Sequence, residues 1–445
     1  MSTRPRLSGM PAFGVVWFGQ IISLLGTNMT GFGLTIWAYT ITGSPTALAL
    51  VNFFFITPML IFSPFAGALV DRSNRKFMMM ISDLASGVAT ILILVLYLTG
   101  RLEIWHLYIT GAFQGVFQAF QWPAYSAAIT TMLPKEQYGR ANGMMSLADS
   151  AAGIFSPVLA AALLAAIGLQ GLLVIDIVTF SFAVGSLLLV HIPKPQVTQA
   201  GLEGKGSLLK EAGYGFRYIL KRPSLLGLQL IFMSANFISS LGTTLMAPLI
   251  LERTGNNEVV YGTVMSAGAI GGVVGGLVMG AWGGPRRRVN GVLSGWILNG
   301  LLGVTLMGLG RGLPVWVVAN FIGIFLIPIV NGSNQAIWQT KVAPDVQGRV
   351  FAIRRLIAWF VIPLATLIAG PLAEFGMEPA MQRGGRLADV FGPLVGTGPG
   401  AGMGLMFVFA GLGAAGVGIV GYLFSVIRQA EQLLPDHDAL PAVAD

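Results

Sequence analysis

The sequence predicts an all-α membrane protein with twelve transmembrane helices in two six-helix halves. Three observations support this fold class. Of the 445 residues, 54% are hydrophobic and only 10% are charged, whereas a soluble globular chain carries about 25% charged residues. The hydrophobic residues are gathered in twelve stretches, each long enough to cross a bilayer, which takes about 20 residues. A polar and basic segment separates the first six stretches from the last six.

Charged residues, prolines and turn residues mark the limits of the stretches, because hydrocarbon rarely accommodates them. In the first half, the predicted helices cover residues 12–40, 46–70, 77–100, 104–132, 139–167 and 170–191. In the second half, they cover residues 223–250, 259–282, 289–310, 313–341, 347–373 and 401–427. The predicted organisation is an N-terminal bundle (1–191), a linker (192–222), a C-terminal bundle (223–427) and a tail (428–445). The part of the linker from Leu208 to Lys221 is predicted to form an amphipathic surface helix.

The placement of lysine and arginine predicts the orientation in the membrane, because cytoplasmic loops carry an excess of both. With the amino terminus in the cytoplasm, all but five of the 26 basic residues lie on the cytoplasmic side. The exceptions are Arg101, Arg253, Arg311, Arg383 and Arg386. Both termini are therefore expected in the cytoplasm, in a membrane of the bacterial inner type. The net charge of +8 is accounted for by contact with anionic membrane lipid, so no nucleic-acid partner is expected.

The composition also excludes several classes of site. The chain has no cysteine, and its three histidines are far apart in the sequence, so disulfides and protein-bound metal centres are not expected. No cofactor is expected. We find neither a P-loop nor a nucleophile elbow, which argues against an enzyme and against transport driven directly by ATP.

The two halves repeat the same pattern. The second predicted helix is followed by GALVDRSNRK (67–76), and the eighth by GAWGGPRRR (280–288). The fourth leads into Gly139-Arg140 and the tenth into Gly348-Arg349. Parallel repeats of one six-helix unit are typical of transporters, whose binding site lies between the halves near the middle of the membrane.

Side-chain amides are concentrated in every third predicted helix, namely 12–40, 104–132, 223–250 and 313–341. An amide is costly against lipid, so these side chains should face protein or a water-filled cavity. In 104–132, Gln114, Gln118, Gln121 and Tyr125 follow one another at intervals of four, three and four residues. This spacing places them on one face of the helix.

A central pathway lined by these four helices accounts for the pattern. Amides beside aromatic rings suit an amphipathic organic solute, which needs apolar contact and a few orienting hydrogen bonds. The alternative is that the amides only join neighbouring helices. The predicted cavity residues are Gln20, Asn28, Gln114, Phe117, Gln118, Gln121, Trp122, Tyr125, Gln229, Asn236, Asn331, Asn334, Gln335 and Trp338.

Asp149 is the first candidate for proton binding. It lies nine residues after Arg140, which is about 13 Å into the helix at 1.5 Å per residue. An ionised aspartate at such depth costs about 2.5–3.5 kcal/mol on insertion scales, and binding a proton removes this cost. The alternative is a structural aspartate hydrogen-bonded to Ser146 or Ser150.

Two other aspartates lie in predicted helices. Asp83 is the second candidate for proton coupling, although its closeness to Lys76 favours pairing with the arginines of the 72–76 loop. Asp176 is expected to reach water at the outer end of its helix. No lysine, arginine or histidine is predicted deep in the bundle, so neutral or cationic solutes are favoured over anions.

The segment GALVDRSNRK resembles the signature loop between helices 2 and 3 of the major facilitator superfamily. Asn74 stands where a glycine is usual, and the second copy lacks the aspartate. In that family the loop acts as a conformational latch. The resemblance implies that Asp71 contacts the start of helix 11 and that Arg72 and Arg75 pair with nearby acids. The residues carried over to this latch are Gly67, Asp71, Arg72, Arg75 and Lys76.

Further segments resemble the drug:proton antiporter branch of that family, in particular the macrolide-efflux-type exporters. They read WFGQIISLLGTNMTGFGL, ITGSPTALAL, FQWPAYSAAITTMLP and GRANGMMSLADSAAGIFSPVLA. Relatives often carry an aspartate at the position of Asn28, which gives Asp149 more weight as the proton site. The antiporter motif of helix 5 reads Ser156-Pro157 here, where the family has a Gly-Pro pair.

These observations predict a monomeric secondary active transporter that exports amphipathic organic compounds in exchange for protons, by alternating access. A narrower alternative is export of one siderophore-like product, or the flipping of a lysolipid between leaflets. An alternative from another class is a membrane receptor that does not transport.

Overall fold

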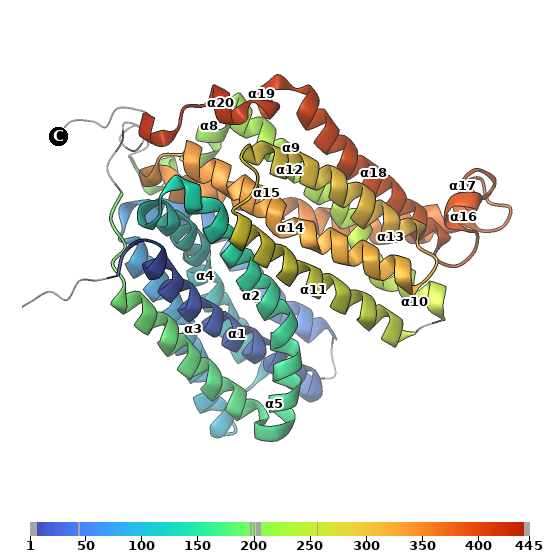
Figure 1. The fold of residues 1–445 in the computed structure, drawn as a ribbon. Coiled ribbons are helices and arrows are strands. Elements are labelled where there is room, and N and C mark those ends of the chain that lie inside the picture. Colours follow the sequence, from blue (N-terminus) through green and yellow to red (C-terminus); the bar gives the residue numbers. More distant parts are fainter. Residues whose placement is uncertain are drawn as a thin grey trace, which may run out of the picture.

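The computed structural model describes residues 7–42, 45–195, 198, 201, 206–255 and 257–439. Arg4, Arg6, Lys205, most of the linker between 196 and 205, and the tail from 440 onward lie outside the described residues. The regular secondary structure of the described part is helical, apart from one isolated bridge between Leu7 and Val190. Its helices form two bundles that follow one another in the chain (Figure 1).

The first bundle contains five helices by backbone continuity. They are α1 (Gly9–Thr42), α2 (Pro45–Arg72), α3 (Arg75–Leu98), α4 (Ile104–Met132) and α5 (Tyr138–Leu189). Gly168 interrupts α5 with a φ of 67° and a ψ of −178°. Because L side chains rarely adopt such a φ, glycine permits the chain to reverse here. The helix therefore has two arms (Figure 1), at the positions of the fifth and sixth predicted helices.

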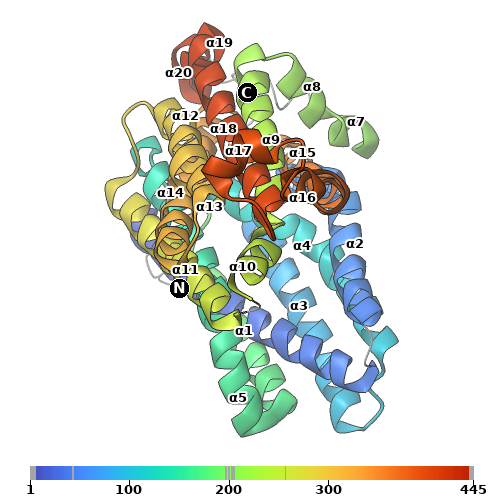
Figure 2. The same cartoon turned by 90° about the vertical axis from the view of Figure 1, so that its right-hand side faces the viewer.

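The second bundle is more interrupted. Its membrane-length segments are α9 with α10 (Pro223–Thr243, Met246–Thr254), α11 (Glu258–Trp282), α12 to α13 (Arg288–Leu298, Leu306–Leu309), α14 (Leu313–Lys341), α15 (Gln347–Pro371) and α18 (Ala401–Leu423). The shorter helices are α16 (Glu378–Met381), α17 (Ala388–Val395), α19 (Ser425–Arg428) and α20 (Ala430–Leu433). A π-helical segment, Asn299–Thr305, joins α12 to α13. Two linker helices, α7 (Leu208–Ala212) and α8 (Tyr214–Leu220), pack against α2 and α15 respectively (Figure 2).

Ten helices of the described part are long and apolar enough to cross a membrane. This set counts both arms of α5 as one helix and omits α4, whose length is 29 residues. The predicted twelve helices are consistent with this result. Large apolar side chains cover the outer faces: Phe18, Ile61 and Val158 are each at least 60% exposed. Such surfaces require a lipid environment, so the prediction of an all-α, multi-pass membrane protein is confirmed.

The two bundles meet at one end, which we call the basic end because it carries Arg72–Lys76, Lys135 and Arg286–Arg288. There α2 packs against α15, and α5 against α11. Glycines allow the closest approach: a Cβ at Gly139 would lie 1.8 Å from the carbonyl oxygen of Gly283. The α5–α11 contact continues to Ser150 and Gly272, whereas a Cβ at Gly153, about one turn farther along, would meet nothing within 4 Å. The bundles are thus joined at the basic end and separate beyond it.

Candidate binding cavity

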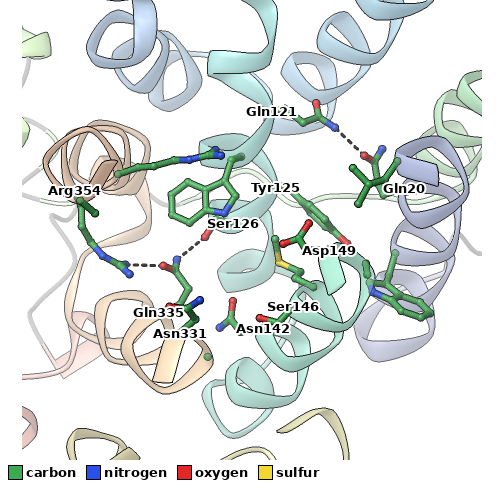
Figure 3. Close-up of a pocket in the computed structure, with 18 of the residues that line it drawn as sticks. Gln20, Gln121, Tyr125, Ser126, Asn142, Ser146, Asp149, Asn331, Gln335 and Arg354 are labelled. Carbon is green, nitrogen blue, oxygen red and sulfur yellow. Dashed lines mark hydrogen bonds between the residues drawn. The ribbon is translucent and has the colours of Figure 1, made fainter. Parts of the chain in front are cut away.

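A cavity of about 370 Å³ lies between the two bundles, on the side of their contact that faces away from the basic end. The first bundle lines it with α1, α4 and α5, and the second with α9, α14 and α15 (Figure 3). Among the residues predicted from the sequence, those that line it are Gln20, Gln118, Gln121, Trp122, Tyr125, Asp149, Asn331 and Gln335. The site is therefore built from both halves of the chain.

The other predicted cavity residues do not line this cavity. They are Asn28, Gln114, Phe117, Gln229, Asn236, Asn334 and Trp338. Two of these amides have partners within their own bundle: Gln229 donates to the carbonyl oxygen of Arg354 at 3.2 Å, and Trp338 Nε1 donates to Asn334 Oδ1 at 3.1 Å. Gln229 therefore fits the alternative in which amides join helices, because it connects α9 to α15, whereas Asn334 and Trp338 belong to the same helix, α14. The contribution of α9 to the wall is Phe232.

The floor of the cavity is a network of buried amides that joins the two bundles. Asn142 on α5 donates to Gln339 Oε1 on α14 at 2.7 Å. Gln339 in turn donates to the carbonyl oxygen of Ser126 on α4 at 2.9 Å. Because hydrogen bonds between buried groups break only at a cost, this network holds the basic end closed beneath the cavity.

Asp83 lies beneath the α1–α4 wall of the cavity and is only 8% exposed. Its two oxygens accept hydrogen bonds from Gln20 Nε2 at 2.9 Å and from Gln121 Nε2 at 3.0 Å. Gln121 also donates to Gln20 Oε1 (Figure 3). The expectation that Asp83 pairs with loop arginines is wrong. Because α3 begins at Arg75, Asp83 lies about two turns into the helix and inside the bundle. There the side-chain amides of Gln20 and Gln121 donate hydrogen bonds to its carboxylate.

Asp149 on α5 lies at the cavity (Figure 3). Asp149 is solvent-exposed although it lies between the two bundles, because its exposed surface forms part of the cavity wall. Among the described residues it has no hydrogen bond to Ser146 or Ser150. The hydrogen bonds that would make Asp149 a structural aspartate are therefore not found in the described part of the chain. Asp176 differs, because it is buried and accepts hydrogen bonds from Thr27 and Thr90 at 3.0 and 2.8 Å. It does not reach water, contrary to expectation.

Two arginines of α15 line the cavity, and the expectation that no basic residue lies deep in the bundle is wrong. Arg354 is 8% exposed, donates to Gln335 Oε1 at 2.6 Å and lies 5.0 Å from the ring centre of Trp338. Arg355 lies between two indoles, with its Cζ 5.1 Å from the ring centre of Trp122 and 4.2 Å from that of Trp359.

Both arginines were counted among the basic residues of the cytoplasmic side, although the predicted helix 347–373 includes them. Because α15 already begins at Gln347, a rise of 1.5 Å per residue places them roughly 10–12 Å along the helix. A count of basic residues near the ends of apolar stretches cannot separate loop arginines from arginines of the first turns. The predicted helix start at residue 347 was the signal that could have identified them, because it agrees with the start of α15 and already places both arginines about two turns into the helix.

The loop between α2 and α3 lies at the contact between the bundles. Asp71 accepts hydrogen bonds from the backbone N–H groups of Gly348 and Arg349 at 2.7 and 2.9 Å, and from Arg349 Nε at 3.0 Å. The contact with the start of the eleventh membrane helix is therefore present. It is favourable because a carboxylate at a helix N-terminus meets unpaired N–H groups and the positive end of the helix dipole.

The basic residues of this loop have different partners. Arg72 pairs with Glu211 of α7 at 2.9 Å, as the resemblance implies. Arg75 is buried and donates to the carbonyl oxygens of Ala127 and Pro344, so its expected pairing with an acid is replaced by backbone contacts. Lys76 donates to the carbonyl oxygen of Val190 at 2.8 Å. A Cβ on Gly67 would lie 2.4 Å from the carbonyl oxygen of Gly348, so glycine is needed here for the helices to approach.

The family model described as Major Facilitator Superfamily matches residues 16–366. The chain belongs to the Major Facilitator Superfamily. A facilitator of this kind is a membrane transporter rather than an enzyme.

Two relatives of this facilitator are named as efflux proteins. Macrolide efflux protein A of Streptococcus pyogenes is 25% identical over 81% of this chain and 89% of its own length. Multidrug efflux pump Tap of Mycolicibacterium fortuitum is 26% identical over 80% of this chain and 90% of its own. Among solved structures, an outward-facing bacterial homologue of the iron transporter ferroportin has a TM-score of 0.66 at 15% identity, over 92% of this chain and 98% of its own. That structural likeness shows the fold alone.

Proposed function

We propose that this facilitator exports amphipathic organic compounds in exchange for protons, by alternating access of the cavity between its two halves. The observation that carries the proposal is the wall of that cavity. It combines aromatic rings, free amides and one carboxylate without a hydrogen-bond partner among the described residues, and both halves contribute to it. The names of the two efflux relatives support export and organic substrates.

The aromatic and amide residues are the part that binds substrate. Trp17, Trp122, Tyr125 and Phe232 offer flat apolar surface. Gln118 and Asn331 lie on the wall, and no hydrogen bond of their side chains is found among the described residues, so they are free to orient a polar group of the substrate. A few polar groups among apolar ones are typical of small-molecule sites.

Asp149 is the proposed exchangeable proton site. It is open to the cavity and therefore to water and substrate, while Asp83 is enclosed and held by two amides. A substrate cation near Asp149 stabilises the ionised carboxylate, so its binding expels the proton. Asp83 remains a second proposed site, reached only when Gln20 and Gln121 separate.

The proposed orientation places the basic end and both termini in the cytoplasm. The transporter is proposed to work as a monomer. The bundles then meet on the cytoplasmic side, held by Asp71 at the start of α15 and by the amide floor. In this arrangement substrate is released to the outside. For the cavity to open again to the cytoplasm, α2 must separate from α15 and α5 from α11.

The proposal is tested by proton release on substrate binding. Purified protein in lipid vesicles is mixed with a panel of cationic dyes, macrolides and lysolipids, and the pH of a weakly buffered solution is followed. We expect proton release with several dyes or macrolides and none from Asp149→Asn protein. Response to lysolipids alone favours the flippase, and response to no compound contradicts the proposed export.

A further inference from the structure

The guanidinium of Arg355 is a charged group whose hydrogen-bonding capacity is unused. No hydrogen bond or ion pair of Arg355 is found within the described ranges, and its neighbours are the rings of Trp122 and Trp359. Aromatic faces stabilise the positive charge, but they supply no oxygen acceptor for its five N–H donors. Taking an arginine out of bulk water is expensive unless such donors are satisfied.

Arg354, its neighbour in the sequence, shows the contrast. Its guanidinium donates to Gln335, and Gln335 donates to the hydroxyl of Ser126 across the bundle interface (Figure 3). Arg354 is thereby occupied within the protein. Of the two arginines that line the cavity, Arg355 is the one without a hydrogen-bond partner among the described residues, so its guanidinium is available to a molecule that enters. The groups that satisfy a guanidinium best are carboxylate and phosphate.

The opposite charge lies on the other half of the molecule. Asp149 belongs to α5 in the first bundle and Arg355 to α15 in the second, and both line the same cavity. Opposite charges attract, but no ion pair between these two side chains is found among the described residues. A substrate that carries only a cation meets the repulsion of Arg355, and one that carries only an anion meets that of ionised Asp149. A substrate with both charges satisfies both residues.

We propose that the cavity selects amphipathic zwitterions, with the anionic group of the substrate on Arg355 and its cationic group near Asp149. This assignment rests on the proposed export function and names its substrate class. It differs from the expectation of neutral or cationic solutes, because that expectation counted the two arginines of α15 with the cytoplasmic residues and not with the cavity. It also remains compatible with exchange for protons, since the cationic group takes the place of the proton on Asp149.

The test compares rhodamine B, a zwitterion with a carboxylate, and rhodamine B methyl ester, which has the same rings and cation but no carboxylate. Binding of each dye to purified protein in lipid nanodiscs is measured by fluorescence anisotropy. We expect wild-type protein to bind rhodamine B more tightly than the ester. Arg355→Gln should weaken rhodamine B binding about tenfold or more, which is the size expected for losing a charge-assisted hydrogen bond, and should tighten ester binding because a repelling cation is removed.

Two further variants separate this role from a general effect on the fold. Arg355→Lys keeps the charge without the planar donors, so it should weaken rhodamine B less than Arg355→Gln does. Arg286→Gln makes the same change at an exposed position of the basic end and should leave both affinities as in wild type. If Arg355→Gln does not fold, the zwitterion assignment is tested by the preference of wild-type protein for rhodamine B over the ester and by the affinities of Arg355→Lys.

The outcomes distinguish the two proposals. If wild-type protein binds neither dye, the proposed export of amphipathic compounds fails, and the substrate class fails with it. If it binds both dyes with equal affinity, or if Arg355→Gln weakens both to the same extent, the export function stands and the zwitterion assignment is overturned.

Discussion

Asp71 and Arg349 form a buried ion pair between the two halves of the transporter. Arg349 Nε lies 3.0 Å from Asp71 Oδ2, and the two side chains are 4% and 2% exposed. The same carboxylate also accepts the N–H groups of Gly348 and Arg349. The last turn of α2 is thus bound to the first turn of α15 by three hydrogen bonds. We therefore infer that this pair stabilises the arrangement in which the basic end is closed.

Asp71→Asn should open the basic end. The substitution removes the charge but keeps the volume, and it leaves Arg349 as an uncompensated buried cation. Removing one partner of a buried pair costs about 3–5 kcal/mol, and opening the end lets Arg349 regain water. Since the chain has no cysteine, Ser146→Cys in the cavity reports access without background. A membrane-impermeant maleimide added on the side of the basic end should label it faster in the Asp71→Asn background.

Arg72→Gln is the matched control for this experiment. It removes a charge from the same loop, but Arg72 is 46% exposed at its side chain and pairs with the linker rather than with the other half. We expect little change in labelling. Equal acceleration by both variants would mean that the charge of the loop matters and not the Asp71–Arg349 pair.

Asp149→Asn should abolish proton-driven export while leaving folded protein. The carboxylate makes no hydrogen bond within the described part of the chain, so its replacement by an isosteric amide removes proton exchange without breaking a structural contact. Transport into vesicles with an imposed pH gradient measures export, and size-exclusion elution monitors folding. Export that still follows the gradient in this variant would remove Asp149 from the mechanism.

In contrast to Asp149→Asn, Asp176→Asn should lower stability and leave proton coupling unchanged. Its carboxylate accepts hydrogen bonds from Thr27 on α1 and Thr90 on α3, so its loss should lower thermal stability, by about 1–3 kcal/mol for partners left unsatisfied. The number of protons released per substrate should stay the same in the protein that remains folded. A change in that number would assign Asp176 to the coupling.

Composition determines where the membrane helices lie along the chain, whereas helix rotation determines which side chains face the cavity. The predicted membrane helices agree with the observed ones because length and apolar content are local properties. The reversal at Gly168 falls between two predicted helices. Whether an amide faces the cavity depends on the rotation of its helix against its neighbours, which spacing does not fix. Gln118 and Gln121 line the cavity, while Gln114 on the same predicted face does not.

The charged residues show the same limit. Both Asp83 and Arg355 lie near the cytoplasmic ends of their predicted helices, so Asp83 was expected to pair with loop arginines and Arg355 was counted with the cytoplasmic residues. In the structure, both residues lie inside the bundle. The partners of Asp83, Gln20 and Gln121, come from other helices, as does Trp122 for Arg355. Trp359 lies one turn farther along the same helix as Arg355. Tertiary packing decides such contacts, and one sequence does not reveal them.

Trp122→Ala and Gln118→Ala should change substrate preference more than the amount of folded protein. Trp122 covers one side of Arg355 and lines the cavity, so its removal takes away aromatic contact area. Gln118 loses only a polar contact to the substrate. We expect the ratio of transport rates across a panel of dyes to change by several-fold. A uniform loss of folded protein would instead support the interpretation that these side chains mainly hold helices together.

The segment 429–439 joins the two halves at the basic end, and this contact should depend on pH. Asp436 pairs with Lys135, between α4 and α5, and with Lys341, at the end of α14, both at 2.8 Å. Partial burial disfavours the charged carboxylate, but the hydrogen bonds from Lys135 and Lys341 outweigh it and hold the pKa of Asp436 below its usual value of 3.8. A lowered pKa means that the contact is fully present above pH 3.8 and is lost as the pH falls through the folded-state pKa.

A spin label at Gln432→Cys, an exposed position of α20, measures this attachment by the mobility of its spectrum. The spectrum should be immobile at neutral pH, become mobile only below about pH 3.8, and be mobile throughout in Asp436→Asn. Asp438→Asn is the control, because its side chain is 58% exposed and such pairs contribute little. It should keep the wild-type transition. A label that stays immobile in Asp436→Asn would show that the segment is held by its backbone contacts to Lys341 and not by the carboxylate.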